Sequence, residues 1–303
     1  METKQKAVVT GGAGFIGSHI ADALVAEGYE VHVVDTLVAG RREHVPEGAT
    51  LHEVDIVDTP ALVSIFKDAA AVLHEAALPR VQFSIDEPIE AHRTNVDGTL
   101  SVLVAAHAAR AGRVIFASSS AVYGNQETLP LREDMPTELV HPYGLHKYMG
   151  ERYLQLFSEL YGLPTVSLRY FNAYGPRLDP EGPYALVIGR FLKQRLNGEP
   201  LTITGDGTQT RDFTHVRDIA RANLAAMTSE RVGKGEVVNI GSGKSVSVNE
   251  LADQFGGERI YVPARIEVKH SLADTARARE LLGWQAEMAL EDGIAELKQL
   301  FGV

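Results

Sequence analysis

The stretch from Gly11 to Gly17 constrains the fold of this chain more than any other, because three glycines recur there with G-x-x-G-x-x-G spacing. The apolar run Ala7-Val8-Val9 precedes these glycines, and apolar residues return at helical spacing after them until Gly28. A glycine turn between a buried strand and an amphipathic helix is typical of a βαβ unit. We therefore predict a strand, a tight turn and a helix at the start of the chain.

Each glycine of this turn has its own physical role in binding a dinucleotide. Gly11 permits the tight turn, Gly14 lets the backbone approach a pyrophosphate at the helix N-terminus, and Gly17 lets helix and strand pack closely. Phe15 and Ile16 open the helix, so their backbone belongs to the same site. The spacing differs from G-x-G-x-x-G, which indicates a variant of the dinucleotide-binding fold.

The end of the second predicted strand, Glu30 to Val34, indicates which dinucleotide is bound. Asp35 follows this strand roughly 20 residues after the glycines, where an acidic side chain accepts hydrogen bonds from the adenosine ribose. A carboxylate there repels the 2′-phosphate of NADP, so we expect NAD as the cofactor. Arg41 and Arg42 keep NADP open as an alternative, because a nearby arginine can bind that phosphate.

Three further predicted strands each end in a cluster of polar or small residues. The runs 51–54, 71–73 and 113–117 are followed by the clusters 55–56, 74–77 and 118–124. Ligands of open parallel sheets bind outside the carboxyl ends of the strands, so these clusters should line one crevice. The alternation of strands and helices predicts an α/β fold with a Rossmann-like doubly wound parallel sheet. His74 and Glu75 have no further ligand at helical spacing, and we expect no metal site.

Composition excludes several other classes of protein. The 303-residue chain has a formal net charge of -11 and no basic block interleaved with aromatic residues, so we expect no nucleic-acid partner. It has no cysteine, which excludes disulfides, thiolate catalysis and cysteine-bound zinc. No apolar run approaches the roughly 18 residues of a membrane span, and 1–6 lead directly into a strand. We expect no membrane association and a cytoplasmic location.

Tyr143 and Lys147 form a candidate proton-transfer pair. They are four residues apart, about one helical turn, so they share a face of the helix predicted over 143–161. A free tyrosine titrates near ~10, and a lysine cation beside it should lower the pKa of the phenol. Such a pair can take a proton from an alcohol, although an exposed helix face would show the same spacing.

Taken together, these features resemble the extended short-chain dehydrogenase/reductase family, and within it the NAD-dependent nucleotide-sugar epimerases and dehydratases. The resemblance covers nearly the whole chain. Besides the glycine turn, Asp35, the serine cluster and the Tyr143/Lys147 pair, it rests on three motifs: Arg169-Tyr-Phe-Asn-Ala-Tyr-Gly-Pro-Arg177, Gly205-Asp-Gly-Thr-Gln-Thr-Arg-Asp-Phe213 and Asn239-Ile-Gly-Ser-Gly243.

The resemblance implies a catalytic set. The catalytic serine or threonine of the family lies four residues before the tyrosine of Val-Tyr-Gly, which selects Ser119 here. Ser118 and Ser120 are neighbours that could serve in its place. Tyr143 would be the base and Lys147 its activator, and both would also contact the cofactor.

The resemblance also implies binding residues. Asp55 and Ile56 resemble contacts to the adenine edge, and Ala76 and Ala77 resemble the loop beside the nicotinamide. The substrate set that the resemblance implies is Ser119, Asn172, Arg211, Ser271 and Arg265. Arginines suit this role because a diphosphate in an acidic protein needs a guanidinium group in its pocket. The segment around Arg265 lacks the Pro-Gly that is common in the family, so its register is open.

The residues after the catalytic serine indicate the type of reaction. In this family a base takes the proton of the sugar 4-hydroxyl while NAD takes the hydride from C4. Dehydratases carry an Asp-Glu pair after the catalytic hydroxyl residue and decarboxylases a Glu, whereas Ser120 and Ala121 stand here. We therefore expect a UDP-sugar 4-epimerase, an isomerase. A 4,6-dehydratase or reductase on a nucleotide sugar, and an inactive NAD-binding regulator, are the alternatives.

One position bears on the choice of sugar. In related UDP-hexose 4-epimerases, the residue three positions before the Asp of an Ala-Asp pair limits the space beside the C2 substituent, and Ser271 occupies that position here. Because serine is small, we expect UDP-GlcNAc and UDP-GalNAc to be accepted as well as UDP-Glc and UDP-Gal.

The order of the motifs predicts two lobes. We expect an NAD-binding Rossmann domain over 1–171 and a smaller α/β substrate-binding lobe over 172–303, with a helix over 215–227 that packs back on the first domain. The long helices predicted over 86–110 and 143–161 would form the seam of a homodimer, since stripes of small residues suit close helix packing.

Overall fold

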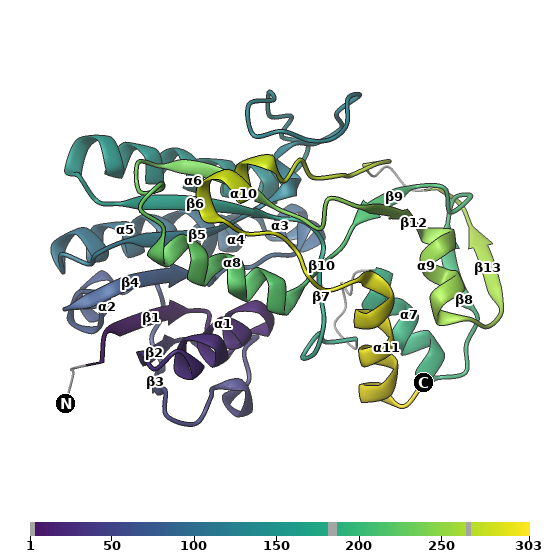
Figure 1. Ribbon diagram of the computed structural model, residues 1–303, viewed down its shortest axis with the longest axis horizontal. Helices are drawn as coiled ribbons and strands as arrows, with labels where there is room; N and C mark the ends of the chain where they lie inside the picture. The colour runs from purple at the N-terminus through teal and green to yellow at the C-terminus, as the bar shows by residue number, and fades with distance from the viewer. Residues whose placement is uncertain (1–3, 181–186, 265–267) are drawn as a thin grey trace.

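The computed structural model describes residues 4–180, 187–264 and 268–303, and these ranges contain a central parallel sheet of seven strands in the order β11-β6-β5-β4-β1-β2-β3 (Figure 1). The strands are β1 (Lys6–Thr10), β2 (Glu30–Val34), β3 (Thr50–His52), β4 (Ala69–His74), β5 (Val114–Ser119), β6 (Thr165–Tyr170) and β11 (Glu236–Ile240). The order reverses between β1 and β4, which creates the crevice where such sheets bind ligands. The predicted Rossmann-like sheet is confirmed.

Helices cover both faces of this sheet (Figure 1). One face packs against α1 (Phe15–Ala26), α8 (Val216–Thr228) and α10 (Ala276–Leu282), and the other against α2 (Thr59–Phe66), α5 (Gly98–Ala108) and α6 (Pro142–Tyr161). The side chains of β1 alternate between the two cores, because successive residues of a strand point to opposite faces. Ala7 and Val9 lie in the first core and Val8 in the second.

The helix predicted over 86–110 is present but is not α-helical throughout. Helix α3 (Val81–Asp86) precedes it, and the helix itself consists of α4 (Pro88–His92), the π-helical segment η2 (Arg93–Asp97) and α5. Single π-helical turns inside α-helices occur frequently at functional sites. Here the π-helical turn carries Asn95, which contacts a loop of the candidate site.

Helix α6 confirms the helix predicted over 143–161. Its first turn is capped by His141, whose Nδ1 accepts a hydrogen bond of 3.0 Å from the Gly144 N–H. A second bond anchors the same turn, because the Tyr143 N–H donates to Ser84 Oγ at 3.1 Å. The helix ends at Gly162, whose φ of 68° favours glycine. Its N-terminal turn is therefore fixed in place.

A separate core lies in the smaller lobe, on the right of Figure 1. The lobe contains β7 (Ala173–Tyr174), α7 (Val187–Leu196), β8 (Leu201–Thr204), β9 (Thr210–Asp212), β10 (Thr214–His215), β12 (Ser245–Ser247), α9 (Val248–Phe255), β13 (Arg259–Val262) and α11 (Leu290–Phe301). Its strands form three small pairs, β10 with β7, β12 with β9 and β13 with β8. Phe191, Phe255 and Leu297 are buried where its helices meet.

The sheet topology differs from the predicted division of the chain. Strand β11 pairs with β6 at the edge of the central sheet, and α10 packs on β11 and α8, although both lie within 172–303. The reason is burial, since Val238 and Ile240 are fully buried against the helix layer. We propose that the dinucleotide-binding domain includes α8, β11 and α10.

Within the described ranges, no helix combines the length and apolar character that a membrane span requires.

Candidate active site

The glycine turn connects β1 to α1 with little free space around it. A Cβ atom on Gly11 would lie 2.6 Å from the Ala76 nitrogen, and one on Gly17 would lie 2.2 Å from the Gly11 oxygen. On Gly14, the only neighbour within 4 Å would be the Gly11 oxygen at 3.2 Å. No side chain caps α1 at Gly14. The backbone N–H groups of the first turn, including that of Phe15, are therefore suited to a pyrophosphate.

Asp35 lies at the end of β2, as expected for a ribose contact. Its Oδ2 accepts a hydrogen bond of 3.0 Å from the Ala13 N–H, and its Oδ1 accepts one of 2.9 Å from the Leu37 N–H. These bonds tie the carboxylate to the glycine turn. Each carboxylate oxygen has a second lone pair, which leaves capacity to accept from ribose hydroxyls.

Arg41 and Arg42 pair with acidic residues of the same exposed region. Arg42 Nη2 lies 2.5 Å from Glu53 Oε1, and Arg41 Nη1 lies 3.9 Å from Glu43 Oε1. A 2′-phosphate would have to compete with these carboxylates for the arginines. The arrangement favours NAD over NADP.

Asp55 and Ile56 occupy different environments. Asp55 is half-buried, and its carboxylate accepts from the Val57 N–H at 3.2 Å and pairs with Arg93 at 3.4 Å. The Ile56 side chain is buried, so close to α5 that a Cβ on Gly98 would lie 2.5 Å from its Cδ1. Only the backbone of Ile56 can therefore face an adenine.

The loop with Ala76 and Ala77 is held from two sides. Asn95 makes two hydrogen bonds to Leu78, the residue after Ala77. Its Oδ1 accepts from the Leu78 N–H at 2.7 Å, and its Nδ2 donates to the Leu78 oxygen at 3.0 Å. On the other side, the Ala76 N–H donates to Thr10 Oγ1 at 3.4 Å. Sequence reasoning missed Asn95, because its role depends on the π-helical turn.

His74 is a neutral side chain that holds the end of β4. Thr99 Oγ1 donates to the Asn95 oxygen at 2.7 Å, so it must accept from His74 Nε2, 3.0 Å away. His74 Nδ1 then accepts from Thr10 Oγ1 at 2.7 Å. Burial lowers the pKa of His74 to about 3, which agrees with this neutral tautomer.

The structure brings Tyr143 and Lys147 together in the first two turns of α6. Both side chains are buried, and Lys147 Nζ lies 5.9 Å from the centre of the Tyr143 ring. The ammonium group also donates a hydrogen bond of 2.6 Å to the Ala117 oxygen and lies 4.8 Å from the Phe116 ring centre. Because both side chains are buried, their spacing is not that of an exposed helix face, which was the alternative explanation.

The three serines of the cluster have different partners. Ser118 Oγ donates to Glu151 Oε1 at 2.5 Å and is buried. Ser119 Oγ accepts from the Ala121 N–H at 3.1 Å and interacts with the Tyr143 phenol. Ser120 begins the 3-10 turn η3 (Ser120–Val122). Ser119 is therefore the serine that the geometry places beside the Tyr143 phenol.

Burial dominates the pKa values of the pair. It raises the pKa of Tyr143 to about 12, and the nearby Glu75 carboxylate adds to this while the Ser119 hydroxyl opposes it. Burial lowers the pKa of Lys147 to about 8, against the attraction of Glu75 and Glu151. The expected lowering of the Tyr143 pKa is thus wrong for the protein alone, because desolvation outweighs the hydrogen bond.

The predicted substrate residues lie where the central sheet meets the smaller lobe. Asn172 follows β6 with a φ of 29°, and its Nδ2 donates to the Asp212 oxygen at 2.7 Å and to Ser271 Oγ at 3.4 Å. Arg211 Nη1 donates to the Thr210 and Lys269 oxygens at 2.9 and 3.1 Å. The structure therefore brings Asn172 and Ser271 together and holds Arg211 on β9. Arg265 lies outside the described residues.

Asp212 is a further residue that sequence reasoning missed. Its carboxylate accepts hydrogen bonds from the backbone N–H groups of Ser242, Gly243 and Ala273, at 2.8, 3.0 and 3.0 Å. It thereby joins the Asn239–Gly243 motif to the segment that carries Ser271. Its burial could not be read from the sequence, although it stands inside a quoted motif.

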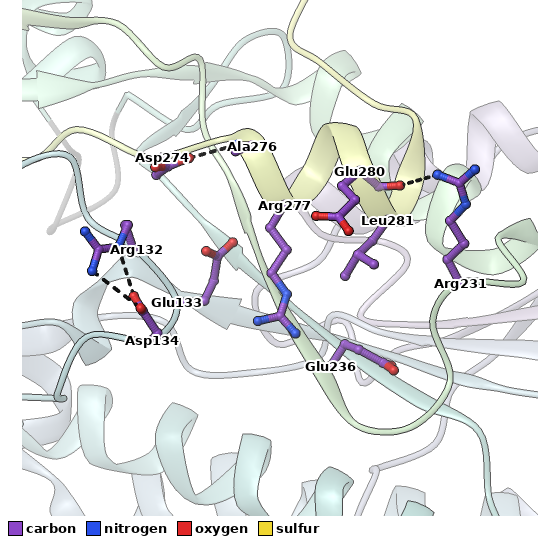
Figure 2. Close-up of a pocket in the computed structure, with 10 residues that line it drawn as sticks. All are labelled: Arg132, Glu133, Asp134, Arg231, Glu236, Asp274, Ala276, Arg277, Glu280 and Leu281. Atoms are coloured by element: carbon purple, nitrogen blue, oxygen red, sulfur yellow. Dashed lines mark hydrogen bonds and ion pairs between the residues drawn. The ribbon is translucent and has the colours of Figure 1, made fainter.

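A cavity of about 560 Å³ lies elsewhere, between the segment that contains α10 and the two segments 132–134 and 231–236 (Figure 2). It is lined by Arg132, Glu133, Asp134, Arg231, Glu236, Asp274, Ala276, Arg277, Glu280 and Leu281. Its charged groups pair within the lining, for example Arg132 with Asp134 at 3.0 Å, and Arg231 donates to the Glu280 oxygen at 2.6 Å. Of the predicted site residues that the structure describes, none lines this cavity.

Comparisons with known proteins identify the family of the chain. Residues 7–241 match the model of the NAD dependent epimerase/dehydratase family. A Methanocaldococcus jannaschii protein assigned provisionally as a UDP-glucose 4-epimerase is 43% identical over 95% of each chain.

Two solved structures are also similar. UDP-glucose 4-epimerase of Thermotoga maritima, with UDP-glucose, has a TM-score of 0.94 at 38% identity and covers 98% of this chain and 99% of its own. UDP-N-acetylglucosamine 4-epimerase of Methanobrevibacter ruminantium, in complex with UDP-N-acetylmuramic acid, has a TM-score of 0.91 at 37% identity with the same coverage. The chain therefore belongs to the NAD-dependent epimerase/dehydratase family.

Proposed function

We propose that this protein catalyses the NAD-dependent 4-epimerisation of a UDP-hexose. The observation that carries the proposal is the arrangement at the carboxyl end of β5, where Ser119 interacts with the Tyr143 phenol and Lys147 Nζ lies 5.9 Å from the Tyr143 ring centre. Ser120 and Ala121 follow Ser119, so neither of the next two residues is an acid or a base. Dehydration or decarboxylation needs a further acid or base at that point, whereas epimerisation does not. The UDP-sugar epimerases among the relatives support the same choice.

The residues divide the chemistry among them. Tyr143, as the phenolate, takes the proton from the sugar 4-hydroxyl, Ser119 holds that oxygen, and Lys147 stabilises the phenolate charge. When bound, NAD would supply the acceptor and donor for the C4 hydride, and its positive charge would favour the phenolate. We expect the glycine turn and Asp35 to hold this cofactor. After the keto sugar rotates, the hydride would return to the opposite face of C4 and Tyr143 would return the proton to O4, which inverts C4.

One observation favours a second candidate. The Glu75 carboxyl enters from the end of β4 and interacts with Tyr143 and Lys147, so an acid does reach the pair from elsewhere in the fold. A 4,6-dehydratase would use such a group to eliminate water. Glu75 accepts a hydrogen bond from Tyr170 and lies on the cofactor loop, which agrees less well with a contact to the sugar C5 and C6.

An assay of the purified protein distinguishes the epimerase from the dehydratase. Incubation with UDP-Gal should yield UDP-Glc by NMR, while the ultraviolet absorbance of NADH stays near baseline because the cofactor is regenerated. A 4-keto-6-deoxy product would instead assign the dehydratase. Net NADH formation with added NAD would contradict an epimerase cycle.

We further propose that N-acetylated sugars are substrates, since Ser271 is small and contacts Asn172. Replacing Ser271 by tyrosine should lower kcat/KM for UDP-GlcNAc by about tenfold or more, because overpacking beside the C2 substituent typically costs ~1–3 kcal/mol. The rate with UDP-Gal serves as the control and should change little. Equal losses on both sugars would show that the position does not select the substituent.

We propose a homodimer through α5 and α6. Exposed apolar side chains gather on these helices, namely Val104, Leu145, Leu156, Leu160 and Tyr161. Burying them in a helix seam would remove them from water. Leu160→Glu should convert the dimer to monomer in sedimentation, whereas Leu300→Glu on the exposed side of α11 should not. A monomeric wild-type protein would contradict the seam.

A cytoplasmic location stays a prediction.

A further inference from the structure

Glu75 is a half-buried residue beside the catalytic pair, and the epimerisation mechanism above does not use its carboxyl group. It follows β4 directly, and its N–H donates to the Thr10 oxygen at 3.1 Å. It also abuts the glycine turn, since a Cβ on Gly11 would lie 3.0 Å from the Glu75 carbonyl carbon. The residue therefore lies at the crevice, immediately before the Ala76 and Ala77 loop.

Two side chains from other elements fix this carboxyl. Tyr170, at the end of β6, donates from its hydroxyl to Glu75 Oε1 at 2.9 Å. Asn223 Nδ2, on α8, donates to the Tyr170 oxygen at 2.7 Å and to the Ile219 oxygen at 3.0 Å. Because the Tyr170 oxygen already accepts from Asn223, its single proton points to Glu75. Tyr170 and Asn223 are buried, so the carboxyl is held in one place.

Strand β4 pairs with β5, where His74 lies beside Phe116, and Lys147 Nζ lies 4.8 Å from the Phe116 ring centre, so the charged groups around Glu75 come mainly from α6. Burial raises the pKa of Glu75 to about 7, opposed by the Tyr170 hydrogen bond and by the Lys147 ammonium group. In return, its carboxylate favours the charged form of Lys147, which Glu151 also attracts, and raises the pKa of Tyr143. His74, the preceding residue, is neutral. Near pH 7, the carboxyl is therefore able to change its charge.

We propose that Glu75 is a positioning residue that sets the ionisation of the base Tyr143 through its charge. The expected effect on turnover rests on the proposed function, whereas the expected effect on the ionisation of Tyr143 does not. In that reaction the sugar loses a hydride from C4 and a proton from O4, and the proton goes to the Tyr143 phenolate. A negative charge fixed near the phenol opposes the phenolate, so a neutral Glu75 makes the base available at lower pH.

The test is a titration of Tyr143 in the NAD-saturated protein, by NMR with isotope-labelled tyrosine. The signal of Tyr143 is identified by its loss in Tyr143→Phe. Glu75→Gln keeps the size of the side chain and an acceptor for Tyr170 but removes the charge. We expect the Tyr143 midpoint to move about one pH unit lower, together with the acid limb of the kcat profile. Glu27→Gln, on an exposed turn, should leave both unchanged.

A second variant changes the ionisation of the Glu75 carboxyl without replacing Glu75 itself. Tyr170→Phe removes the hydrogen bond that stabilises the ionised carboxyl, so Glu75 stays neutral to higher pH and the Tyr143 midpoint again moves lower, by less. A Tyr143 midpoint that is unchanged or higher in Glu75→Gln would overturn the proposal. The titration needs no sugar, so it gives an answer even if no UDP-hexose is epimerised.

Discussion

Replacement of Tyr143 by phenylalanine should reduce the epimerisation rate by about 10² to 10⁴-fold, because the sugar O4 proton then has no acceptor. The side chain lies within the Ser119 and Lys147 set, and its ring is buried, so the phenylalanine ring fills the same space. The loss should appear in kcat. NAD should remain bound, which cofactor retention through gel filtration measures.

The matched control is Tyr153→Phe, on the same helix. Tyr153 is half-buried against the core behind the sheet and contacts none of the catalytic residues in the described interactions. It should keep the wild-type rate. A Tyr143→Phe enzyme with an undiminished kcat would remove Tyr143 from its role as base, and loss of NAD would assign it to cofactor binding instead.

Much of the cofactor half of the site followed from short-range patterns. The glycine turn and Asp35 each stand at a strand end, and an apolar run followed by a glycine marks that end clearly. The edge of the sheet was less predictable. Strand β11 joins β6 from 70 positions further along the chain, since Glu236 pairs with Val166 and Ile240 with Tyr170. Nothing local distinguishes β11 from a strand of the smaller lobe.

The choice among three serines depended on the fold. Ser118 and Ser119 are adjacent at the end of β5, and both interact with side chains of α6, Ser118 with Glu151 and Ser119 with Tyr143. Only the placement of this helix therefore shows which serine lies beside the Tyr143 phenol. Glu75 is a similar case, since the position of its carboxyl depends on the hydrogen bonds of Tyr170 and Asn223. The sequence contained these residues without any spacing that joined them.

The largest expected loss of stability comes from Glu151→Gln. Glu151 accepts two hydrogen bonds from Arg169, at 2.8 and 2.7 Å, and one from Ser118 at 2.5 Å. Both charged side chains are buried behind the catalytic pair. Glutamine would leave the Arg169 guanidinium, which lies 4.6 Å from the Tyr123 ring centre, without a counter-charge. The free energy of unfolding should fall by about 3–5 kcal/mol, measured by denaturant titration.

Two comparisons show that the unpaired charge causes this loss. Glu53→Gln breaks the exposed pair with Arg42 and should change the free energy of unfolding by at most about 1 kcal/mol. The double variant Glu151→Leu with Arg169→Met removes both charges and should recover most of the stability, because no buried ion remains unpaired. If the double variant were less stable than Glu151→Gln alone, the hydrogen bonds of the pair, rather than its charge balance, would hold this region.

Lys147 connects this pair to catalysis, since Glu151 helps to keep its ammonium group charged. Glu151→Gln should therefore also lower the pH at which Lys147 loses its proton, a change that the alkaline limb of kcat would show.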